Sequence, residues 1–569
     1  MKLRRLLFAF ISSVILFASC EKSEPEILAD ITVSKTELSF GRSAVDAQAY
    51  LTISSTYAWS ALPSADWISL SKSSGPANTE TKVLVKATTN ESTEGRESKI
   101  VITSGSSTKE IIVKQIRGVL TMTASQIKDY DRIYNPGGSD HISLTSDGNW
   151  FFGRSAQSEH FIAFWQKEYG EFGETTPSNA SQGKVDIDAL LAWCEECYNG
   201  YVKTMKFSDE GRSILDRHKM NIYITYPANW ADPSAAAYGS GVEDQVGCLW
   251  LNATWANDKS IVAHEVGHSF QYIVGCDKIY NKETKDASSY AFRYDVGQGN
   301  GFWEQCAQWM AYLMCPDQTF TTWEFPEYCK AVNKHQLHED NRYSNYFIHH
   351  YMTDRYGIDA VAEIWKNARR PKDALEVYMD IHDLSIEEFN AQMYEYAAKV
   401  ATWDFDGLRE TGIKYINKIR HKLSKGEDGS YTVDPSCCPE ATGFNVIRVQ
   451  NYRKGSTITL DLEGVPNAPG FNKSGTATDG GWTVGFVALS SDNSTRYYSP
   501  SAIATAESDY KTSISWTIPE DTNRLWAIVS ATPVKYISHK WDENNSNDRH
   551  WPYKIKVDGG TPVNTTTGN

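Results

Sequence analysis

The sequence predicts a multidomain protein in which an N-terminal and a C-terminal β-sandwich flank a central α+β domain. At 569 residues the chain is too long for one hydrophobic core. Residues 31–115 consist of short β-branched runs separated by Ser, Gly and Asn turns, a pattern typical of a β-sandwich. Helical periodicity mixed with strands follows, and strands return from about residue 431, which favours a second sandwich of a jelly-roll kind.

The composition indicates a globular, acidic protein. Hydrophobic residues make up 41% of the chain, which is enough apolar surface to build cores. The formal net charge is -15, and we find no dense Lys/Arg stripe beyond the extreme N-terminus. Because a negative surface repels phosphate backbones, we expect no nucleic-acid partner.

The N-terminus reads as an export signal. Basic residues precede the apolar run Leu6 to Phe17, and small residues lead to Cys20. This order resembles a bacterial lipobox, which would make Cys20 the lipidated first residue of the mature chain; the alternative is a plain secretory signal with an incidental cysteine. We therefore expect an exported lipoprotein of the outer membrane, on the cell surface or the periplasmic face, attached to the membrane by its lipid alone.

Nine cysteines remain in the mature body, and an odd number cannot pair completely. Cys194 and Cys197 have the spacing of half a zinc ribbon or of a redox pair, but no second pair completes a ribbon. The neighbours Cys437 and Cys438 cannot easily bridge to each other. The sequence therefore predicts no particular disulfide.

The first sandwich resembles a BACON domain. The likeness rests on Trp59, the run Asp66-Trp67-Ile68-Ser69, Gly75, Asn90, Gly95-Arg96 and the closing Val113-Lys114-Gln115. It implies an immunoglobulin-like fold and an association with carbohydrate or glycoprotein, with a spacer role as the alternative. Large aromatics on strands are usually buried, so we expect Trp59 and Trp67 in the core rather than on a sugar-binding platform.

Several elements are predicted for the central domain. We expect a long helix over residues 185–207, strands over 220–225 and 247–252, and a helix that begins after Asp258 and ends at Gly275. Further helices are expected over 302–314, 343–356, 358–367 and 386–400, and C-terminal strands over 456–462, 483–489, 512–518 and 525–529. The predicted boundaries are a signal peptide at 1–20, a linker at 21–29, domains at 30–117, 118–426 and 427–558, and a polar tail at 559–569.

The central chemical motif is His264-Glu265-Val266-Gly267-His268. Residues four apart share a helix face, so both imidazoles can point at one ion while Glu265 lies beside it as a base for a water. Two imidazoles suit zinc. The motif alone also occurs on ordinary surface helices, but the apolar residues around it predict a buried helix, where two histidines and a glutamate are costly without a metal.

Downstream, Asn300-Gly301-Phe302-Trp303-Glu304 resembles the second metal-binding helix of gluzincin metallopeptidases, in which a glutamate is the third ligand. The resemblance covers residues 120–426 and implies a zincin-like fold, Zn²⁺ as cofactor and Glu304 as third ligand, with Asp277 or Glu283 as alternatives. It also implies that the run ending at Asn252 is the edge strand along which a peptide lies. Metzincins need Gly and His or Asp where this chain has Gln271 and Val274.

A further helix that begins near Tyr343 resembles one that carries an oxyanion-stabilising tyrosine in several gluzincins. Tyr343 is the candidate and Tyr346 the reserve; both could instead simply pack against Trp365. His335, His338, His349 and His350 are alternative electrophiles. His335 and His338 could form a second metal site, but we expect them on a solvated face.

These motifs are compatible with two functions. The first is a zinc-dependent endopeptidase that acts on extracellular protein or glycoprotein, including mucin-type glycoproteins, as the gluzincin and BACON resemblances together imply. The second is a surface glycan- or glycoprotein-binding lipoprotein with a structural or vestigial zinc site. Glu265 favours the first, because a structural site gains nothing from a glutamate beside its first histidine.

Overall fold

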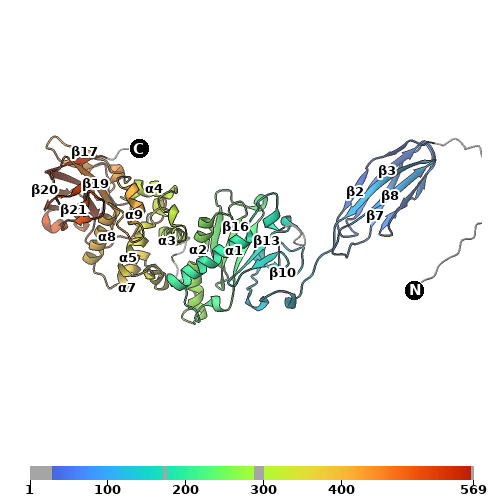
Figure 1. The fold of residues 1–569 in the computed structure, drawn as a ribbon, viewed down its shortest axis with the longest axis horizontal. Coiled ribbons are helices and arrows are strands. Elements are labelled where there is room, and N and C mark those ends of the chain that lie inside the picture. The colour runs from blue at the N-terminus through green and yellow to red at the C-terminus, as the bar shows by residue number, and fades with distance from the viewer. Residues whose placement is uncertain (1–27, 171–175, 288–291, 293–299, 474, 565–569) are drawn as a thin grey trace, which may run out of the picture. The chain divides into compact units, whose positions relative to one another are not determined.

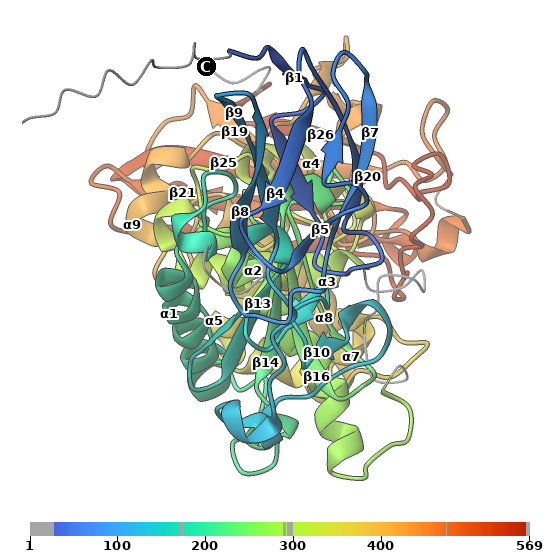
Figure 2. The ribbon, with the colours of Figure 1, turned by 90° about the vertical axis from the view of Figure 1, so that its right-hand side faces the viewer.

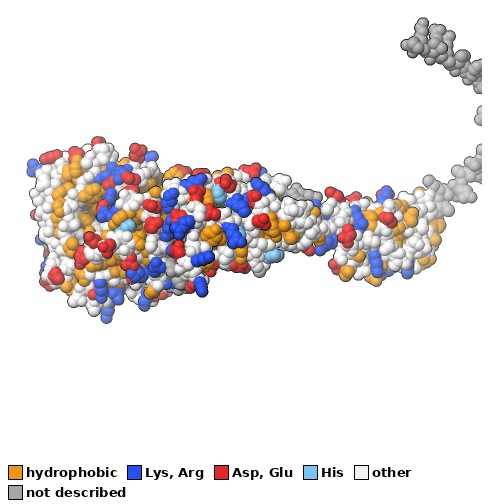
Figure 3. Space-filling model, turned by 90° about the horizontal axis from the view of Figure 1, so that it is seen from below, with side chains coloured by type: hydrophobic (Ala, Val, Ile, Leu, Met, Phe, Trp, Pro, Cys, Tyr) orange, Lys and Arg blue, Asp and Glu red, His pale blue; other side chains and the backbone are white. Residues whose placement is uncertain are grey.

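A computed structural model describes residues 28–170, 176–287, 292, 300–473 and 475–564, and the chain divides into two compact units, residues 1–121 and 122–569 (Figure 1). The signal peptide and Cys20 lie outside the described residues. None of the helices in the described ranges is long and apolar enough to cross a membrane. On the face drawn in Figure 3, acidic and basic side chains are interspersed.

The first unit is a β-sandwich, as predicted. Its sheets have the strand orders β1-β3-β7-β5 and β2-β9-β8-β4-β6. Trp59 is 2% exposed and lies in the core, whereas Trp67 is half-buried beneath the guanidinium of Arg96. The strands are β1 (Ile31–Val33), β2 (Glu37–Phe40), β3 (Gln48–Ser55), β4 (Trp59–Pro63), β5 (Ile68–Leu70), β6 (Ser74–Gly75), β7 (Thr81–Ala87), β8 (Arg96–Ser104) and β9 (Ser107–Gln115).

The second unit begins with a five-stranded sheet of order β12-β13-β14-β16-β15. Its inner strands β13, β14 and β16 are parallel, and the two edge strands are antiparallel to their neighbours. Helices α1 and α2 pack on this sheet (Figures 1 and 2). The elements are β12 (Ser155–Gln157), β13 (Phe161–Trp165), α1 (Ile187–Tyr198), β14 (Met220–Thr225), β15 (Ala237–Val242), β16 (Val246–Asn252) and α2 (Lys259–Tyr280); the two-residue strands β10 (Ile142–Ser143) and β11 (Trp150–Phe151) form a separate pair.

Two expectations for this sheet and for the helix that packs on it are wrong. The run ending at Asn252 is β16, an inner strand, and the edge is β15, whose Gly-Ser-Gly sequence has low strand propensity. Helix α2 starts at Asp258 as predicted but continues through Gly275 to Tyr280. A Cβ at Gly275 would lie 2.9 Å from that of Ala287, so this glycine permits close packing and does not end the helix.

Helices and a second sandwich complete the unit. The helices are α3 (Asn300–Met314), α4 (Glu324–Ala331), α5 (Phe347–Tyr356), α6 (Ala360–Lys366), α7 (Ala374–Ile381), α8 (Ile386–Val400) and α9 (Arg409–Gly412). The strands are β17 (Leu423–Lys425), β18 (Tyr431–Val433), β19 (Phe444–Gln450), β20 (Thr457–Gly464), β21 (Gly481–Ser490), β22 (Arg496–Tyr498), β23 (Ala502–Thr505), β24 (Lys511–Thr517), β25 (Thr522–Ala531), β26 (Tyr553–Asp558) and β27 (Thr561–Val563).

The C-terminal strands form two facing sheets, β17-β18-β26-β20-β24 and β22-β21-β25-β19-β27, around one core. Residues 561–563, expected to be part of a polar tail, pair with β19 instead. Phe444, Val487 and Trp526 of these sheets also belong to the core of the helical part. Because that core continues across residue 426, the expected boundary there lies inside one compact unit.

Candidate functional site

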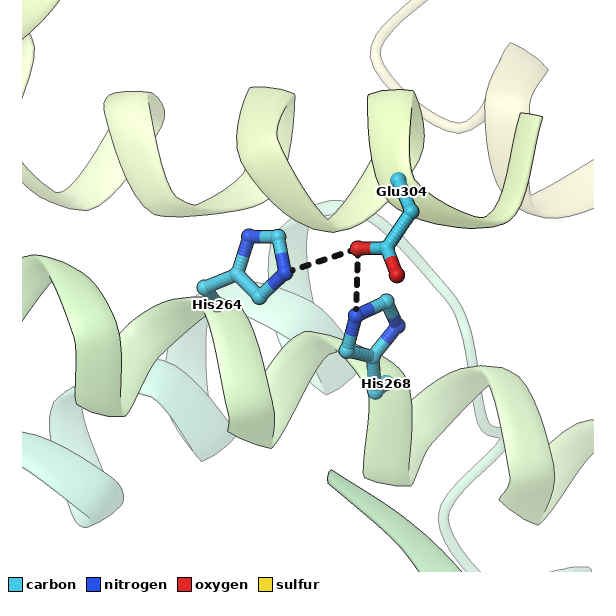
Figure 4. Close-up of side chains that lie close together, drawn as sticks. All are labelled: His264, His268 and Glu304. Carbon is cyan, nitrogen blue, oxygen red and sulfur yellow. Dashed lines mark hydrogen bonds and ion pairs between the residues drawn. The ribbon is translucent and has the colours of Figure 1, made fainter. Parts of the chain in front are cut away.

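The two histidines of the central motif and Glu304 converge between two packed helices (Figure 4). His264 and His268 lie one turn apart on α2, and Glu304 comes from α3. The Nε2 atoms of His264 and His268 lie 3.1 and 3.0 Å from Glu304 Oε2. All three side chains are buried, with exposures of 9%, 4% and 6%. The three ligand atoms are therefore held around one point.

The protonation of His268 is fixed by Gln271. The Gln271 amide group donates to the carbonyl of Trp303 at 3.0 Å, so its oxygen faces His268 Nδ1 at 2.9 Å. Nδ1 must then donate, so Nε2, directed at the centre of the cluster, is the nitrogen that would bind a metal ion. The indole of Trp303 stacks on the His268 ring at 4.9 Å between centroids and holds its plane. Neither Gln271 nor Trp303 was predicted from the sequence as part of the site.

The donor set fits a zinc ion. Two imidazole nitrogens and one carboxylate oxygen are the ligands of catalytic zinc sites that keep a position open. Burial raises the pKa of Glu304, but the opposing effect of the two histidines is larger. The net pKa of this carboxyl group therefore lies well below its usual range. Among the described residues, no Lys or Arg forms an ion pair with this carboxylate. The described part of the chain therefore places no lysine or arginine at the point where a metal would bind.

Glu265 lies on the same helix, 8% exposed. Burial raises its pKa to about 7; the charge of His264 and the backbone N–H of Gly239 oppose this rise, and Glu304 adds to it. A Cβ at Gly239 would come within 2.1 Å of the Glu265 carbonyl oxygen. Only glycine therefore lets the edge strand β15 approach α2 at this point.

The alternative third ligands lie elsewhere. Asp277 accepts hydrogen bonds from Ser208, Ser213 and the backbone N–H of Ile214, at 2.8 Å each. Glu283 is half-exposed and lies 3.3 Å from Lys278. Neither belongs to the cluster of His264, His268 and Glu304.

Tyr343 lies next to the cluster, with its ring centroid 6.1 Å from that of His264. It precedes α5, which begins at Phe347 and not at Tyr343 as expected. The reserve candidate Tyr346 is fully buried and donates its hydroxyl to the carbonyl of Thr319 at 2.6 Å, so it is committed to the core.

The other predicted histidines are also buried. His349 stacks on Phe302 at 4.9 Å and packs against Trp309, and burial lowers the pKa of His350 to about 4. His335 and His338 are 2% and 0% exposed in a loop, so the expectation of a solvated face is wrong. The described cysteines are all unpaired.

His338 belongs to a second cluster, with Glu440 and Asp548. Here the chain supplies its own cation. Lys334 Nζ lies 2.9 Å from Glu440 and 3.2 Å from His338 Nε2. His338 Nδ1 accepts from the N–H of Asp340 at 2.9 Å, so the proton of the neutral ring is on Nε2, which contacts Asp548 at 3.0 Å. An ammonium group thus occupies the place that a metal would take.

Comparison with known proteins places the chain in a family. The model described as "Family of unknown function (DUF6055)" matches residues 125–564, so the chain belongs to this family. The BACON model matches residues 57–115, which confirms the expected BACON domain. No curated protein matches the chain.

Several solved structures are similar to parts of the chain. Domains 4 and 5 of the S-layer protein SbsC share 18% identity, covering 15% of this chain and 51% of that one, with a TM-score of 0.13. A Bacteroides ovatus GH5 xyloglucanase shares 13% sequence identity with a TM-score of 0.16. The match covers 44% of this chain and 63% of the xyloglucanase. The family 22 carbohydrate-binding module of Clostridium thermocellum Xyn10B shares 12% sequence identity with a TM-score of 0.16. The match covers 26% of this chain and 82% of the module. The chain therefore spans about half of the length of the S-layer structure and about three fifths of the length of the xyloglucanase.

Proposed function

We propose that this protein is a zinc-dependent endopeptidase of the gluzincin type that acts on extracellular protein or glycoprotein substrates. The observation that carries the proposal is the convergence of His264, His268 and Glu304 on one point, where no described Lys or Arg forms an ion pair with Glu304. A bound zinc ion would polarise the scissile carbonyl and make a water more acidic.

The chain's own residues supply the rest of the chemistry. Glu265, buried beside His264 on the same helix, takes a proton from the attacking water and later passes it to the leaving amine. Gln271 holds His268 in the tautomer that a metal ligand needs. Tyr343, beside His264, is the candidate donor to the developing oxyanion.

The edge strand β15 is the proposed platform for the peptide. Its residues Gly239 and Gly241 lie against α2, and Gly239 contacts Glu265 directly. An extended peptide that pairs with this edge would pass the general base. The BACON domain supports a glycoprotein substrate, because the resemblance associates such domains with carbohydrate.

The second candidate function is a lipid-anchored glycan- or glycoprotein-binding protein with a structural zinc site. The BACON match favours it, and a lipid on Cys20 would place it at the outer membrane. Structural zinc sites, however, usually have four protein ligands rich in cysteine. No described cysteine joins the three-residue cluster.

Metal analysis and a substrate screen test the proposal together. The purified protein should contain about one zinc per chain, and His264→Ala should lose it, while His141→Ala, a change of an exposed histidine outside the cluster, should retain it. Glycosylated and deglycosylated mucin-type substrates should then be compared for zinc-dependent cleavage. Zinc retained by the His264→Ala, His268→Ala double variant would refute the site.

A further inference from the structure

A long segment of the C-terminal sandwich lies against the loop that carries Tyr343. This β25–β26 segment, residues 532–552, connects two strands and contains no helix or strand of its own. Connections longer than ~12–15 residues without secondary structure are uncommon in compact domains, and the ordered ones usually have a function. The α4–α5 loop, residues 332–346, places Tyr343 beside His264. The contacts between the segment and the loop therefore bear on the candidate site.

Glu339 joins the α4–α5 loop to the segment at a buried position. Its side chain is 2% exposed. One carboxylate oxygen contacts the ring of His539, and the other accepts the backbone N–H of Glu543 at 2.8 Å. Burial raises the pKa of Glu339, but the contact with His539 lowers it, and the net pKa is about 2. The side-chain amide of Asn545 also donates to Asp340 at 3.0 Å. Because a buried ion pair is costly to break, Glu339 is the strongest of these links.

Arg342 connects the segment with Tyr343 itself. Its Nη1 donates to the carboxylate of Glu543 at 2.9 Å. Its guanidinium lies 5.2 Å from the ring centroid of Trp541 and 6.0 Å from that of Tyr343, distances at which a cation attracts an aromatic ring. The Tyr343 ring is in turn 6.1 Å from that of His264. A continuous set of contacts therefore leads from the segment to the metal cluster.

The core side of the loop is held by other bonds. The side-chain amide of Asn341 donates to the carbonyl of Ala331 at 3.0 Å, and that of Asn345 donates to the carbonyl of Gln336 at 2.8 Å. These bonds do not involve the β25–β26 segment. The loop should therefore stay folded when its contacts with the segment are weakened, and only the orientation of its outer side chains should change.

We propose that the β25–β26 segment positions Tyr343 against the His264 cluster, so that the C-terminal sandwich completes the active site. Glu339 and Arg342 are positioning residues, which act through Tyr343 and do not contact the substrate. This inference rests on the proposed peptidase function, in which Tyr343 donates to the developing oxyanion. A small displacement of such a donor lowers the rate strongly, because the hydrogen bond to the transition state depends on its geometry.

A double-mutant cycle on the full-length protein tests this role. Tyr343→Phe removes the hydroxyl and should lower kcat by roughly a hundred-fold. Glu339→Gln and Arg342→Gln should each lower kcat by roughly ten-fold with zinc content unchanged. In the Tyr343→Phe background neither change should lower kcat further, because both act through the missing hydroxyl. Equal losses in the two backgrounds would overturn the inference.

Hydrogen exchange tests the positioning without any cleavage assay. Glu339→Gln and Arg342→Gln should speed the exchange of the backbone amides of residues 339–346 by roughly ten-fold and leave α2 and α3 unchanged. Lys540→Gln, a change of an exposed residue of the same segment, is the matched control and should alter neither exchange nor kcat. Unchanged loop exchange in both positioning variants would overturn the inference. An inactive wild type whose variants show faster loop exchange would refute the peptidase proposal and still support the positioning of Tyr343.

Discussion

Replacement of Glu265 by Gln separates catalysis from metal binding. Glutamine keeps the volume of the side chain and an oxygen that can accept the N–H of Gly239, so the approach of β15 to α2 should survive. The amide cannot take a proton from water. The change therefore removes one chemical step at a site that is 8% exposed and otherwise intact.

The expected loss follows from the role of a general base. Such a base contributes on the order of a hundred- to ten-thousand-fold, which corresponds to about 3 to 5 kcal/mol of transition-state stabilisation. The kcat for a zinc-dependent cleavage should fall by this factor while KM and zinc content stay close to wild type. Peptide cleavage, with zinc measured on the same samples, gives all three quantities.

A matched control is available beside the same helix. Glu283 is half-exposed just beyond the end of α2, so Glu283→Gln changes the same chemical group outside the site and should leave kcat unchanged. If Glu265→Gln cleaves as fast as wild type in a zinc-dependent way, the mechanism is refuted even if the metal site is right. If the wild-type protein cleaves no substrate, the result supports the alternative that the protein is a glycan- or glycoprotein-binding protein.

Three further outcomes are expected. Gln271→Leu should lower zinc affinity by roughly ten- to a hundred-fold in a chelator competition, because His268 loses the acceptor that orients it; unchanged affinity would contradict this role. Cys20→Ala should move the protein from the membrane to the soluble fraction, and continued membrane retention would indicate another anchor. For His350 the folded pKa of about 4 lies below the unfolded value near 6.5, so its contribution to stability is complete above pH 6.5 and is lost as the pH falls towards 4. Between pH 7 and pH 4.5 these two pKa values correspond to about 2 kcal/mol of lost stability, which His350→Phe should not lose in urea unfolding; an equal loss in the variant and the wild type would contradict this role.

The sequence predicted most elements of the chain, because periodicity reports burial directly. The alternating runs of the first sandwich and the helices over 302–314 and 386–400 all appear close to their predicted positions. Where the prediction failed, the cause was a contact distant in sequence. Gly275 looked like a helix end, but it lies in the helix interior because Ala287 packs against it.

The sequence predicted only those features of the site that depend on the spacing of residues within one helix. The one-turn separation of His264 and His268 places both on one face, but the approach of Glu304 depends on how α3 packs against α2. The role of Gln271 could not be predicted either, because it also depends on how α3 packs against α2. It depends on a carbonyl of α3, at Trp303, that turns the amide towards His268.

The two histidine clusters show why the groups around a ring matter as much as the ring itself. His268 donates from Nδ1 to Gln271, so its Nε2, which is directed at Glu304, is the nitrogen that a metal would bind. His338 accepts at Nδ1, so its proton is on Nε2, and Lys334 supplies the positive charge. Both clusters combine buried histidine and carboxylate, but among the described residues only the second also contains a lysine. Zinc binding is therefore expected at the first cluster, and not at the second, where zinc would have to displace a lysine.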